Sequence, residues 1–353
     1  MSSPLKPFFS LSFEEFQAWL ADHKIPKFRG EQVFQWVYKK GVTDFSQMTN
    51  LSKDLQQTFS TSFSFPEFKM EEFVSPDEVR KFHVHLKDGK SIEAVWIPET
   101  SRATLCISSQ VGCAMACKFC VTGLQGFARN LTVEEILMQV YYVRHVRKLQ
   151  VTNIVFMGMG EPLLNYDNVV KSVNMLTNVK AFELGLRKVS VSTVGMIPKI
   201  LSFMEETNVR LAISLTGSSN DSRNHWMPIN QKHNLQELKK VLKQLPDNKW
   251  RKIMFEVVMI RDQTDTEEQA KNLVDFLKGL SAKVNLIPYN ENPHFPNLKA
   301  PKREQLLMYR DKLMKAGFHT TIRKTRGSGI FGACGQLSSS KYGNQNESLP
   351  ITN

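Results

Sequence analysis

The chain has 353 residues and a mass of 40.5 kDa, enough for one large domain and a smaller one. Its 46 Lys and Arg residues outnumber its 34 Asp and Glu residues, and the net charge of +12 favours a polyanionic partner such as nucleic acid. It has no apolar signal sequence or membrane-length apolar stretch, and five cysteines are too few for a secreted disulfide scaffold, so we expect a cytoplasmic monomer with no membrane partner.

Residues 1–75 are expected to form a small helical accessory domain. The segment from Ser12 to Glu15 reads as a capping box, and residues 31–39 place apolar side chains at helical spacing. Five basic residues in this domain could contact RNA, or could equally be a solvated basic face: Lys24, Lys27, Arg29, Lys39 and Lys40.

Residues 76–100 are expected to form a β-hairpin extension. Two β-like runs, 79–86 and 91–97, flank a turn that contains Asp88 and Gly89. The second run carries Glu93, which for an isolated glutamate in a hairpin would ordinarily be a solvated surface residue.

Residues 101–337 alternate between strand-like and helix-like patterns, which predicts a parallel sheet with crossover helices. Six such repeats are fewer than a closed eight-fold barrel needs, so the predicted fold class is α/β, a partial (β/α)6 barrel with its active site at the carboxyl ends of the strands. Residues 338–353 are polar and are expected to form a flexible tail. Strands are predicted at 105–108, 153–157, 189–193, 209–215, 253–260, 284–288 and 320–323.

Three cysteines, Cys113, Cys117 and Cys120, lie on one eight-residue segment. Three thiolates can hold three irons of a cuboidal cluster and leave the fourth iron free for a substrate. The alternatives are a zinc site completed by a distant histidine and unrelated core cysteines, but closed zinc sites usually pair their cysteines in two short clips.

The Cys-x3-Cys-x2-Cys spacing resembles the cluster loop of the radical S-adenosylmethionine (SAM) superfamily. The segment from Met157 to Pro162 is similar to the Gly-Glu-Pro motif that holds the SAM amino group in that superfamily. The resemblance implies a single 4Fe-4S cluster bound by the three cysteines, with SAM at the remaining iron.

Four longer segments resemble one family, the RlmN/Cfr group of radical SAM adenine methyltransferases acting on 23S rRNA, and its RlmN branch in particular. They are residues 105–113, 156–162, 284–290 and 323–337. The resemblance implies that SAM is contacted by Gly160, Glu161, Ser192, Ser214, Leu215, Thr216 and Asn290.

The same resemblance assigns the two remaining cysteines. Cys334 corresponds to the residue that carries the methyl group and Cys106 to a second essential thiol, while Glu93 matches the proton acceptor. From sequence alone, Cys106 in an apolar run could be an inert core residue, whereas Cys334, near Arg323 and other basic residues, is expected to be an exposed thiol with a lowered pKa.

The implied reaction is methylation of C2 of adenosine in 23S rRNA, and in tRNA as a further substrate. Two SAM molecules would be used per turnover: one methylates Cys334, and the other is cleaved reductively to a radical that activates that methyl group. The resemblance also implies an electron donor such as flavodoxin or ferredoxin. Arg323 and Arg326 are expected to grip phosphate. The alternatives are C8-directed methylation of the Cfr kind and a non-catalytic iron-sulfur RNA-binding protein.

Overall fold

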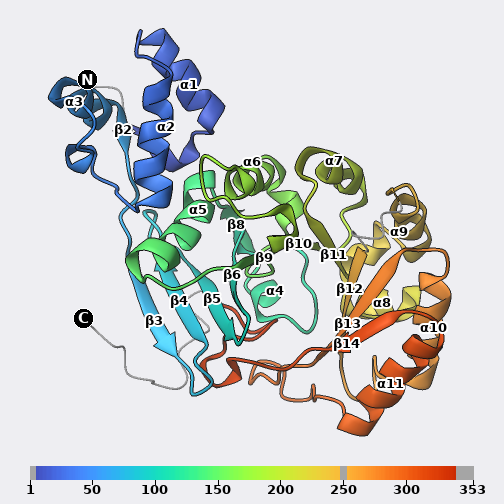
Figure 1. Ribbon diagram of the computed structural model, residues 1–353. Helices are drawn as coiled ribbons and strands as arrows, with labels where there is room; N and C mark the ends of the chain where they lie inside the picture. Colours follow the sequence, from blue (N-terminus) through green and yellow to red (C-terminus); the bar gives the residue numbers. More distant parts are fainter. Residues whose placement is uncertain (1–4, 247–252, 339–353) are drawn as a thin grey trace.

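The computed structural model describes residues 5–246 and 253–338, and a mixed sheet of ten strands runs through these residues (Figure 1). Seven neighbouring strands are parallel, and three antiparallel strands extend the sheet at one edge. In sheet order they are β14 (His319–Ile322), β13 (Ala282–Pro288), β12 (Ile253–Met259), β11 (Arg210–Ser214), β10 (Val189–Thr193), β9 (Asn153–Phe156), β6 (Arg102–Ile107), β5 (Ser91–Glu99), β4 (Arg80–His85) and β3 (Met70–Val74).

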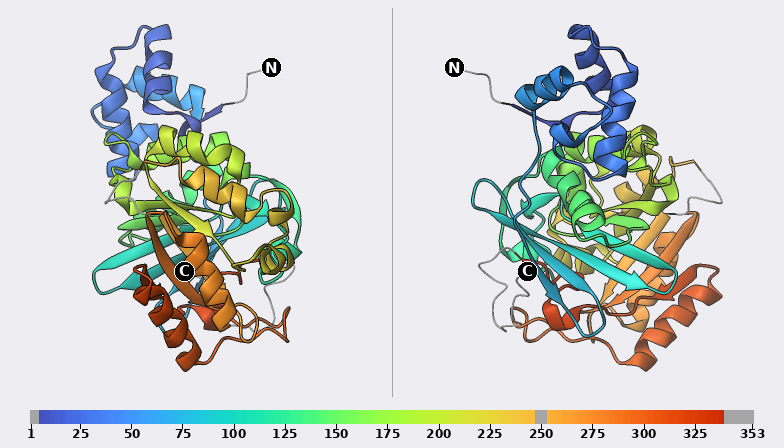
Figure 2. Two further views of the ribbon diagram at one scale, coloured as in Figure 1. Left: turned by 90° about the vertical axis from the view of Figure 1, so that its right-hand side faces the viewer. Right: turned by 60° about the vertical axis from the view of Figure 1, so that its left-hand side comes forward.

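The parallel strands follow one another in chain order, and helices on the outer side of the curved sheet join them (Figures 1 and 2). This arrangement confirms the predicted α/β partial barrel, with a strand near each predicted position and six crossovers within the described residues. The crossover helices are α5 (Val133–Tyr141), α6 (Tyr166–Thr177), α7 (Ile197–Thr207), α8 (Asn220–Trp226), α9 (Leu235–Leu242), α10 (Glu267–Leu277) and α11 (Arg303–Lys315). Across the ranges 5–246 and 253–338, no helix is both long and apolar enough to span a membrane.

The helical unit stands at one end of the barrel (Figure 2). Its helices are α1 (Phe13–Asp22), α2 (Phe28–Phe34), a π-helical turn (Gln35–Lys39) and α3 (Lys53–Ser62), and a short parallel pair joins β1 (Lys6–Pro7) to β2 (Phe63–Ser64). The predicted capping box is present before α1, because Ser12 and Glu15 each accept a hydrogen bond from the other's backbone N–H. The unit packs on α5, where the ring of Phe9 lies 4.9 Å from that of Tyr141.

The antiparallel extension has one strand more than the predicted hairpin. Strand β3 pairs with β4 from Met70 to Val74, so a division after residue 75 would cut through the sheet. We therefore propose that the helical unit ends near residue 64, where β2 ends. Of the tail expected at 338–353, Ser338 is buried, and residues 339–353 lie outside the described residues.

Phe8 lies at the centre of the helical unit. Its side chain is completely buried, and six aromatic rings stand within 6.4 Å of its own: Phe16, Phe34, Tyr38, Phe45, Phe63 and Phe65.

Phe8→Ala should therefore destabilise this unit by about 3–5 kcal/mol, because it removes a large buried ring and leaves a cavity. Urea unfolding monitored by tryptophan fluorescence measures this loss. The control is Phe28→Ala, whose ring is 55% exposed and should cost less than ~0.5 kcal/mol. Equal effects of the two changes would contradict the packing described.

Candidate active site

The three-cysteine loop, residues 113–120, lies between β7 (Gln110–Gly112) and α4 (Val121–Leu124). Strand β7 pairs with β8 (Phe127–Asn130), and the N–H of Cys113 donates to the carbonyl of Gly126, which closes the base of the loop. Gly112 is required there: its φ is +74°, and an added Cβ would stand 1.9 Å from the Gly126 oxygen. The loop is therefore held at both ends by backbone contacts.

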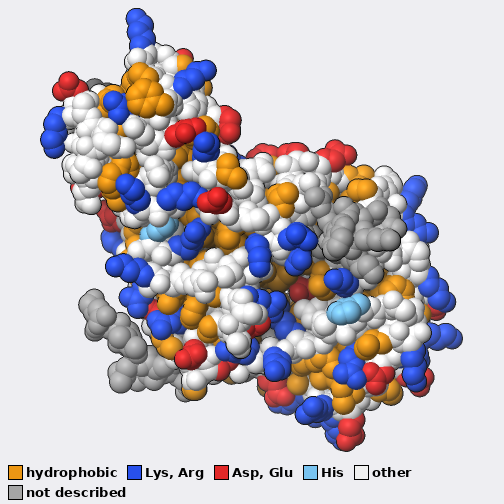
Figure 3. Space-filling model, viewed as in Figure 1, with side chains coloured by type: hydrophobic (Ala, Val, Ile, Leu, Met, Phe, Trp, Pro, Cys, Tyr) orange, Lys and Arg blue, Asp and Glu red, His pale blue; other side chains and the backbone are white. Residues whose placement is uncertain are grey.

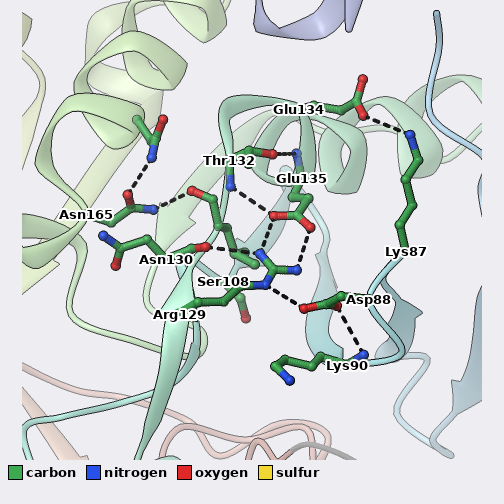
Figure 4. Close-up of polar contacts among 12 residues, drawn as sticks. Lys87, Asp88, Lys90, Ser108, Arg129, Asn130, Thr132, Glu134, Glu135 and Asn165 are labelled. Atoms are coloured by element: carbon green, nitrogen blue, oxygen red, sulfur yellow. Dashed lines mark hydrogen bonds and ion pairs between the residues drawn. The ribbon is translucent and has the colours of Figure 1, made fainter. Parts of the chain in front are cut away.

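Arg129 on β8 anchors the strand that leaves this loop (Figure 4). Its guanidinium binds both carboxylate oxygens of Glu135 on α5 at 2.8 Å and also contacts Asp88 of the hairpin turn at 2.8 Å. The Arg129 side chain holds the pKa of Asp88 down at about 2. Glu135 also completes a capping box with Thr132. One arginine thus joins the hairpin, the cysteine loop and the first crossover helix.

The three thiols fit a cluster of the expected kind. All are free, they influence one another electrostatically, and burial raises the pKa of each, that of Cys113 to about 12. Bound iron favours the thiolate form and would overcome this cost. Among the described residues, no three His, Cys, Asp or Glu side chains are arranged around a single metal ion. A cubane does not need that arrangement, because each thiolate binds a different iron.

Glu161 follows β9 and is almost completely buried. Its two carboxylate oxygens accept hydrogen bonds from the N–H groups of Leu163 and Val194, at 3.0 and 2.8 Å. Burial nevertheless raises the pKa of Glu161 to about 7. Gly160, with a φ of +102°, is needed for close packing, because an added Cβ would stand 2.5 Å from the Cβ of Gln110. Because no described Lys, Arg or His forms an ion pair with Glu161, this buried carboxylate is suited to receive an ammonium group.

The other expected SAM contacts come from neighbouring strand ends. Ser192 and Ser214 have hydroxyl oxygens 3.3 Å apart on β10 and β11. Leu215 and Thr216 are completely buried, and the Thr216 hydroxyl accepts a hydrogen bond from the N–H of Val258. The amide nitrogen of Asn290 donates to the carbonyl of Cys334 at 2.9 Å. Its amide oxygen is buried and has no partner within residues 5–246 and 253–338, so it is available to a ligand.

Cys106 and Cys334 line one cavity of about 1230 Å³ inside the barrel. Cys106 comes from β6, and Cys334 comes from the segment after β14. Met157, Glu256, Asn290 and Arg323 line the same cavity. Figure 3 shows a hollow in this face of the molecule with Lys and Arg side chains around it. The two thiols that the family resemblance pairs are therefore brought together, although 228 residues separate them along the chain.

The expectation of an exposed Cys334 thiol with a lowered pKa is wrong. Cys334 is half-buried, and desolvation raises its pKa, although the positive charge of Arg323 opposes the rise. Burial and the neighbouring Cys334 raise the pKa of Cys106 to about 12, again against Arg323. Arg323 is thus the cation that favours the thiolate form of both cysteines.

Glu93 is not a surface residue. It is 2% exposed, and one carboxylate oxygen lies 2.9 Å from the ammonium of Lys81, itself buried. The other oxygen accepts a hydrogen bond from the N–H of Ser338 at 2.9 Å. Glu93 is therefore tied directly to the segment that carries Cys334, although it does not itself line the cavity.

The two arginines expected to bind phosphate differ. Arg326 is engaged with Asp77, whose carboxylate lies 3.0 Å from its Nε and also accepts from the Gly327 N–H. It holds the Cys334 segment against the antiparallel extension and is not a free phosphate ligand. Arg323 points to the cavity, with Glu256 at 3.9 Å.

Three buried ionisable residues were not identified from the sequence. Glu256 lies within β12 and faces the cavity, and Lys81 pairs with Glu93. Arg223 on α8 is 1% exposed and donates to the carbonyls of Val194 and Ser214, beside the expected SAM contacts. Glu256 could have been noticed in the sequence, because it is a charged residue inside an otherwise apolar strand. The sequence gives no such indication for Arg223, because the other residues of its helix are mostly polar.

The raised pKa of Glu161 predicts how stability depends on pH in the protein without bound ligands. The folded protein keeps a proton on this carboxyl up to about pH 7, whereas the unfolded chain releases it near 4.5. The retained proton on Glu161 therefore stabilises the folded protein by about 3 kcal/mol below pH 4.5, and this contribution is lost as the pH rises to 7.

Denaturant unfolding at pH 5 and pH 7.5 should show this loss in the unaltered protein. Glu161→Gln cannot ionise at this position, so its free energy of unfolding should fall less between these two pH values than that of the unaltered protein. Identical pH dependence of the two proteins would contradict the assignment of the burial effect to Glu161.

Comparisons with known proteins agree with this geometry. The model of the radical SAM superfamily matches residues 107–277, and that of the ribosomal RNA large subunit methyltransferase N-terminal domain matches residues 8–64. The chain is 40% identical to the probable dual-specificity RNA methyltransferase RlmN of Thermosipho melanesiensis, covering 94% of this chain and 98% of that protein. It is 43% identical to the dual-specificity RNA methyltransferase RlmN of Halorhodospira halophila, covering 88% and 87%.

A solved structure is also similar. The crystal structure of a radical SAM methyltransferase from Sphaerobacter thermophilus superposes with a TM-score of 0.88 at 34% identity, over 95% of this chain and 99% of that one. Both the barrel and the helical unit therefore have counterparts in that protein. Identity of about 40% over nearly the whole length, together with a three-cysteine loop in a partial barrel, shows that the chain belongs to the RlmN family of radical SAM RNA methyltransferases.

Proposed function

We propose that this protein methylates C2 of adenosine in 23S rRNA and in tRNA, and that Cys334 carries the methyl group. The observation that carries the proposal is the cavity that Cys106 and Cys334 share, with Arg323 near both thiols. C2 of adenine is an electron-poor carbon with no lone pair, so direct attack on a sulfonium methyl group is unfavourable. A thiol that first takes the methyl group divides the reaction into easier steps.

Each protein residue has a defined task in holding the reactants. Cys113, Cys117 and Cys120 would hold one 4Fe-4S cluster, and Glu161 and the unpartnered oxygen of Asn290 are suited to the SAM amino group. Gly160, Ser192, Ser214, Leu215 and Thr216 would complete this site. The bound cluster supplies the electron that cleaves SAM, and so the radical that takes hydrogen from the Cys334 methyl group. Two SAM molecules are used per turnover, one for each task.

The later steps use Glu93 and Cys106. Once the methylene carbon on Cys334 has bonded to C2, the adduct would give up one electron, for which the oxidised cluster held by Cys113, Cys117 and Cys120 would be the acceptor, and Glu93 would accept the C2 proton. The Cys106 thiolate then attacks the Cys334 sulfur. A disulfide forms, the carbon–sulfur bond breaks, and its electron pair remains with the carbon, which takes a proton and becomes the methyl group. Reduction of the disulfide by an external thiol restores the enzyme.

The charge and the cysteines support the remaining assignments. The net charge of +12 and the basic residues that line the cavity suit an RNA substrate, with Arg323 as the contact nearest the thiols. A flavodoxin or ferredoxin would supply electrons. Five free cysteines and an oxygen-sensitive cluster suit the reducing cytoplasm, and we propose a monomer there.

Two alternatives predict different outcomes. Cfr-like methylation would place the methyl group on C8, but the curated relatives reported above are named RlmN, which supports the C2 assignment. A non-catalytic iron-sulfur RNA-binding protein would not need two thiols in one cavity.

Incubation of the anaerobically reconstituted protein with SAM, a reductant and transcribed 23S rRNA or tRNA tests the proposal. Mass spectrometry of the digested RNA should find 2-methyladenosine from both RNAs. Formation of 8-methyladenosine alone would support the Cfr-like alternative, and an absence of product with an intact cluster would support the binding protein.

A further inference from the structure

Glu93 faces a line of polar residues on the adjacent strand. In the β4–β5 pairing, Glu93 is opposite His83 and Val95 is opposite Lys81, so these side chains share one face of the sheet. Lys81 lies 2.9 Å from the carboxylate of Glu93, and the Nδ1 of His83 lies 3.9 Å from the same oxygen. Glu93, Lys81 and His83 are 2%, 5% and 8% exposed.

A buried carboxylate can act as a base only if it is ionised. Burial alone disfavours its charge, and a neighbouring ammonium favours it. The Lys81 ammonium contacts one Glu93 carboxylate oxygen, the Ser338 N–H donates to the second oxygen, and the Ser108 hydroxyl donates to the Glu93 backbone carbonyl. The carboxylate is thus fixed from β4 and from the segment that carries Cys334, and the Glu93 backbone is fixed by Ser108, directly after β6.

The line continues from His83 to the surface. The rings of His83 and His85 are 4.9 Å apart, and the Nε2 of His85 lies 2.8 Å from the carboxylate of Glu71 on β3. The side chains of His85 and Glu71 are 44% and 51% exposed. Because alternate residues of β4 lie on one face, proton-accepting groups lead from the buried carboxylate to solvent. The gap of 3.9 Å between Glu93 and His83 needs one bridging water or a small rotation of the ring.

We propose that Lys81 is a positioning residue that holds the Glu93 carboxylate in place, and that His83, followed by His85 and Glu71, carries the proton from Glu93 to solvent. The inference rests on the role proposed above for Glu93. The C2–H bond breaks with its electron pair left in the ring, and a proton bonds to Glu93. That proton then moves to His83 and outward, which restores the carboxylate for the next turnover.

Lys81→Met tests the positioning role. In single-turnover reactions the covalent protein–RNA adduct, seen as a slow band on denaturing gels, should resolve at least ~10-fold more slowly at pH 7. Lys81→Arg, which keeps a cation beside the carboxylate, should retain most of the rate, and Lys90→Met, at the exposed end of the same hairpin, should match the unaltered protein. An equal loss in Lys81→Arg and Lys81→Met would overturn the positioning role.

A second readout does not depend on cofactors. Carbon-13 NMR of glutamate-labelled protein without cluster or SAM, recorded at one pH, should show the Glu93 carboxyl resonance, assigned by its loss in Glu93→Gln, displaced in Lys81→Met and unchanged in Lys90→Met. An unchanged resonance in Lys81→Met would overturn the inference.

His83→Leu tests the exit route. The first turnover should proceed at the normal rate, because Glu93 still accepts the proton, but later turnovers should slow by about tenfold. Unchanged multiple turnover would overturn the exit route. Glu93→Gln distinguishes the role of Glu93 from the roles of Lys81 and His83. If adduct resolution is normal in Glu93→Gln, the proposed role of Glu93 fails. If it is blocked while Lys81→Met and His83→Leu behave normally, only this inference fails.

Discussion

Cys334→Ala should abolish RNA methylation while leaving iron content, SAM binding and RNA binding unchanged. The thiol is the only group at that position that can form a thioether with the methyl group, and alanine offers no nucleophile. The variant should keep the fold, because Asn290 binds the Cys334 backbone carbonyl and not its side chain. We expect methylation to fall below detection, by at least ~10⁴-fold.

The matched control is Cys106→Ala, which removes the other thiol of the same cavity. It should still accept a methyl group on Cys334 and form the RNA adduct, but the adduct should persist because no disulfide can form. Intact-protein mass spectrometry after incubation with SAM measures the methyl group on Cys334, and denaturing gels measure the adduct. Normal methylation by Cys334→Ala would show that the methyl group is not carried on this residue.

Cys117→Ala should lose the cluster, and with it reductive SAM cleavage and RNA methylation. Cys117 is buried at the centre of the loop and interacts electrostatically with both other cysteines, so its removal leaves two thiolates for the cluster. The loss should exceed the ~10–100-fold effect that is usual for a residue outside the metal's ligand set. The visible absorbance and the iron content after anaerobic reconstitution should fall to background.

Cys106→Ala serves here as the comparison, because it removes a free buried cysteine outside the loop. Its absorbance and iron content should equal those of the unaltered protein. Circular dichroism should show both variants folded, since Gly112, Gly126 and the Arg129 contacts hold the loop through its ends. A normal cluster in Cys117→Ala would exclude Cys117 as a ligand.

Local signals in the sequence predicted most of the fold. Alternating strand and helix patterns place all seven parallel strands, and the capping box at Ser12 marks the start of α1. These features depend on neighbouring residues. Strand β3 was missed because its half-buried residues do not alternate clearly between apolar and polar, and it is a strand through its pairing with β4.

The register of the β4–β5 hairpin also could not be predicted from the sequence. Residues Lys87–Gly89 form the turn, with the Leu86 N–H donating to the Lys90 carbonyl, and this turn sets His83 opposite Glu93. A turn of two residues would shift the register by one and place Val84 there instead. The Lys81–Glu93 pair could not be recognised until the turn length was known.

The sequence predicted the chemical motifs of the site better than the burial, charge partners and pKa shifts of its residues. The three-cysteine loop is visible because its ligands lie within eight residues, whereas Cys106 and Cys334 were paired only through the family resemblance. The pKa of Cys334 was predicted in the wrong direction, because nearby basic residues are visible in sequence and burial is not. Arg326 was misjudged for a similar reason, since its partner Asp77 is 249 residues away.

The central claim is that the methyl group is carried on Cys334 and loses one hydrogen before it reaches adenine. Reaction with SAM whose methyl group is fully deuterated, followed by mass spectrometry of the methyladenosine, tests it most directly. The account predicts a methyl group with two deuterons and one hydrogen, because one deuteron is abstracted on Cys334 and a solvent proton enters when the carbon–sulfur bond breaks. A product that keeps all three deuterons would show direct transfer from SAM to RNA and would contradict the account.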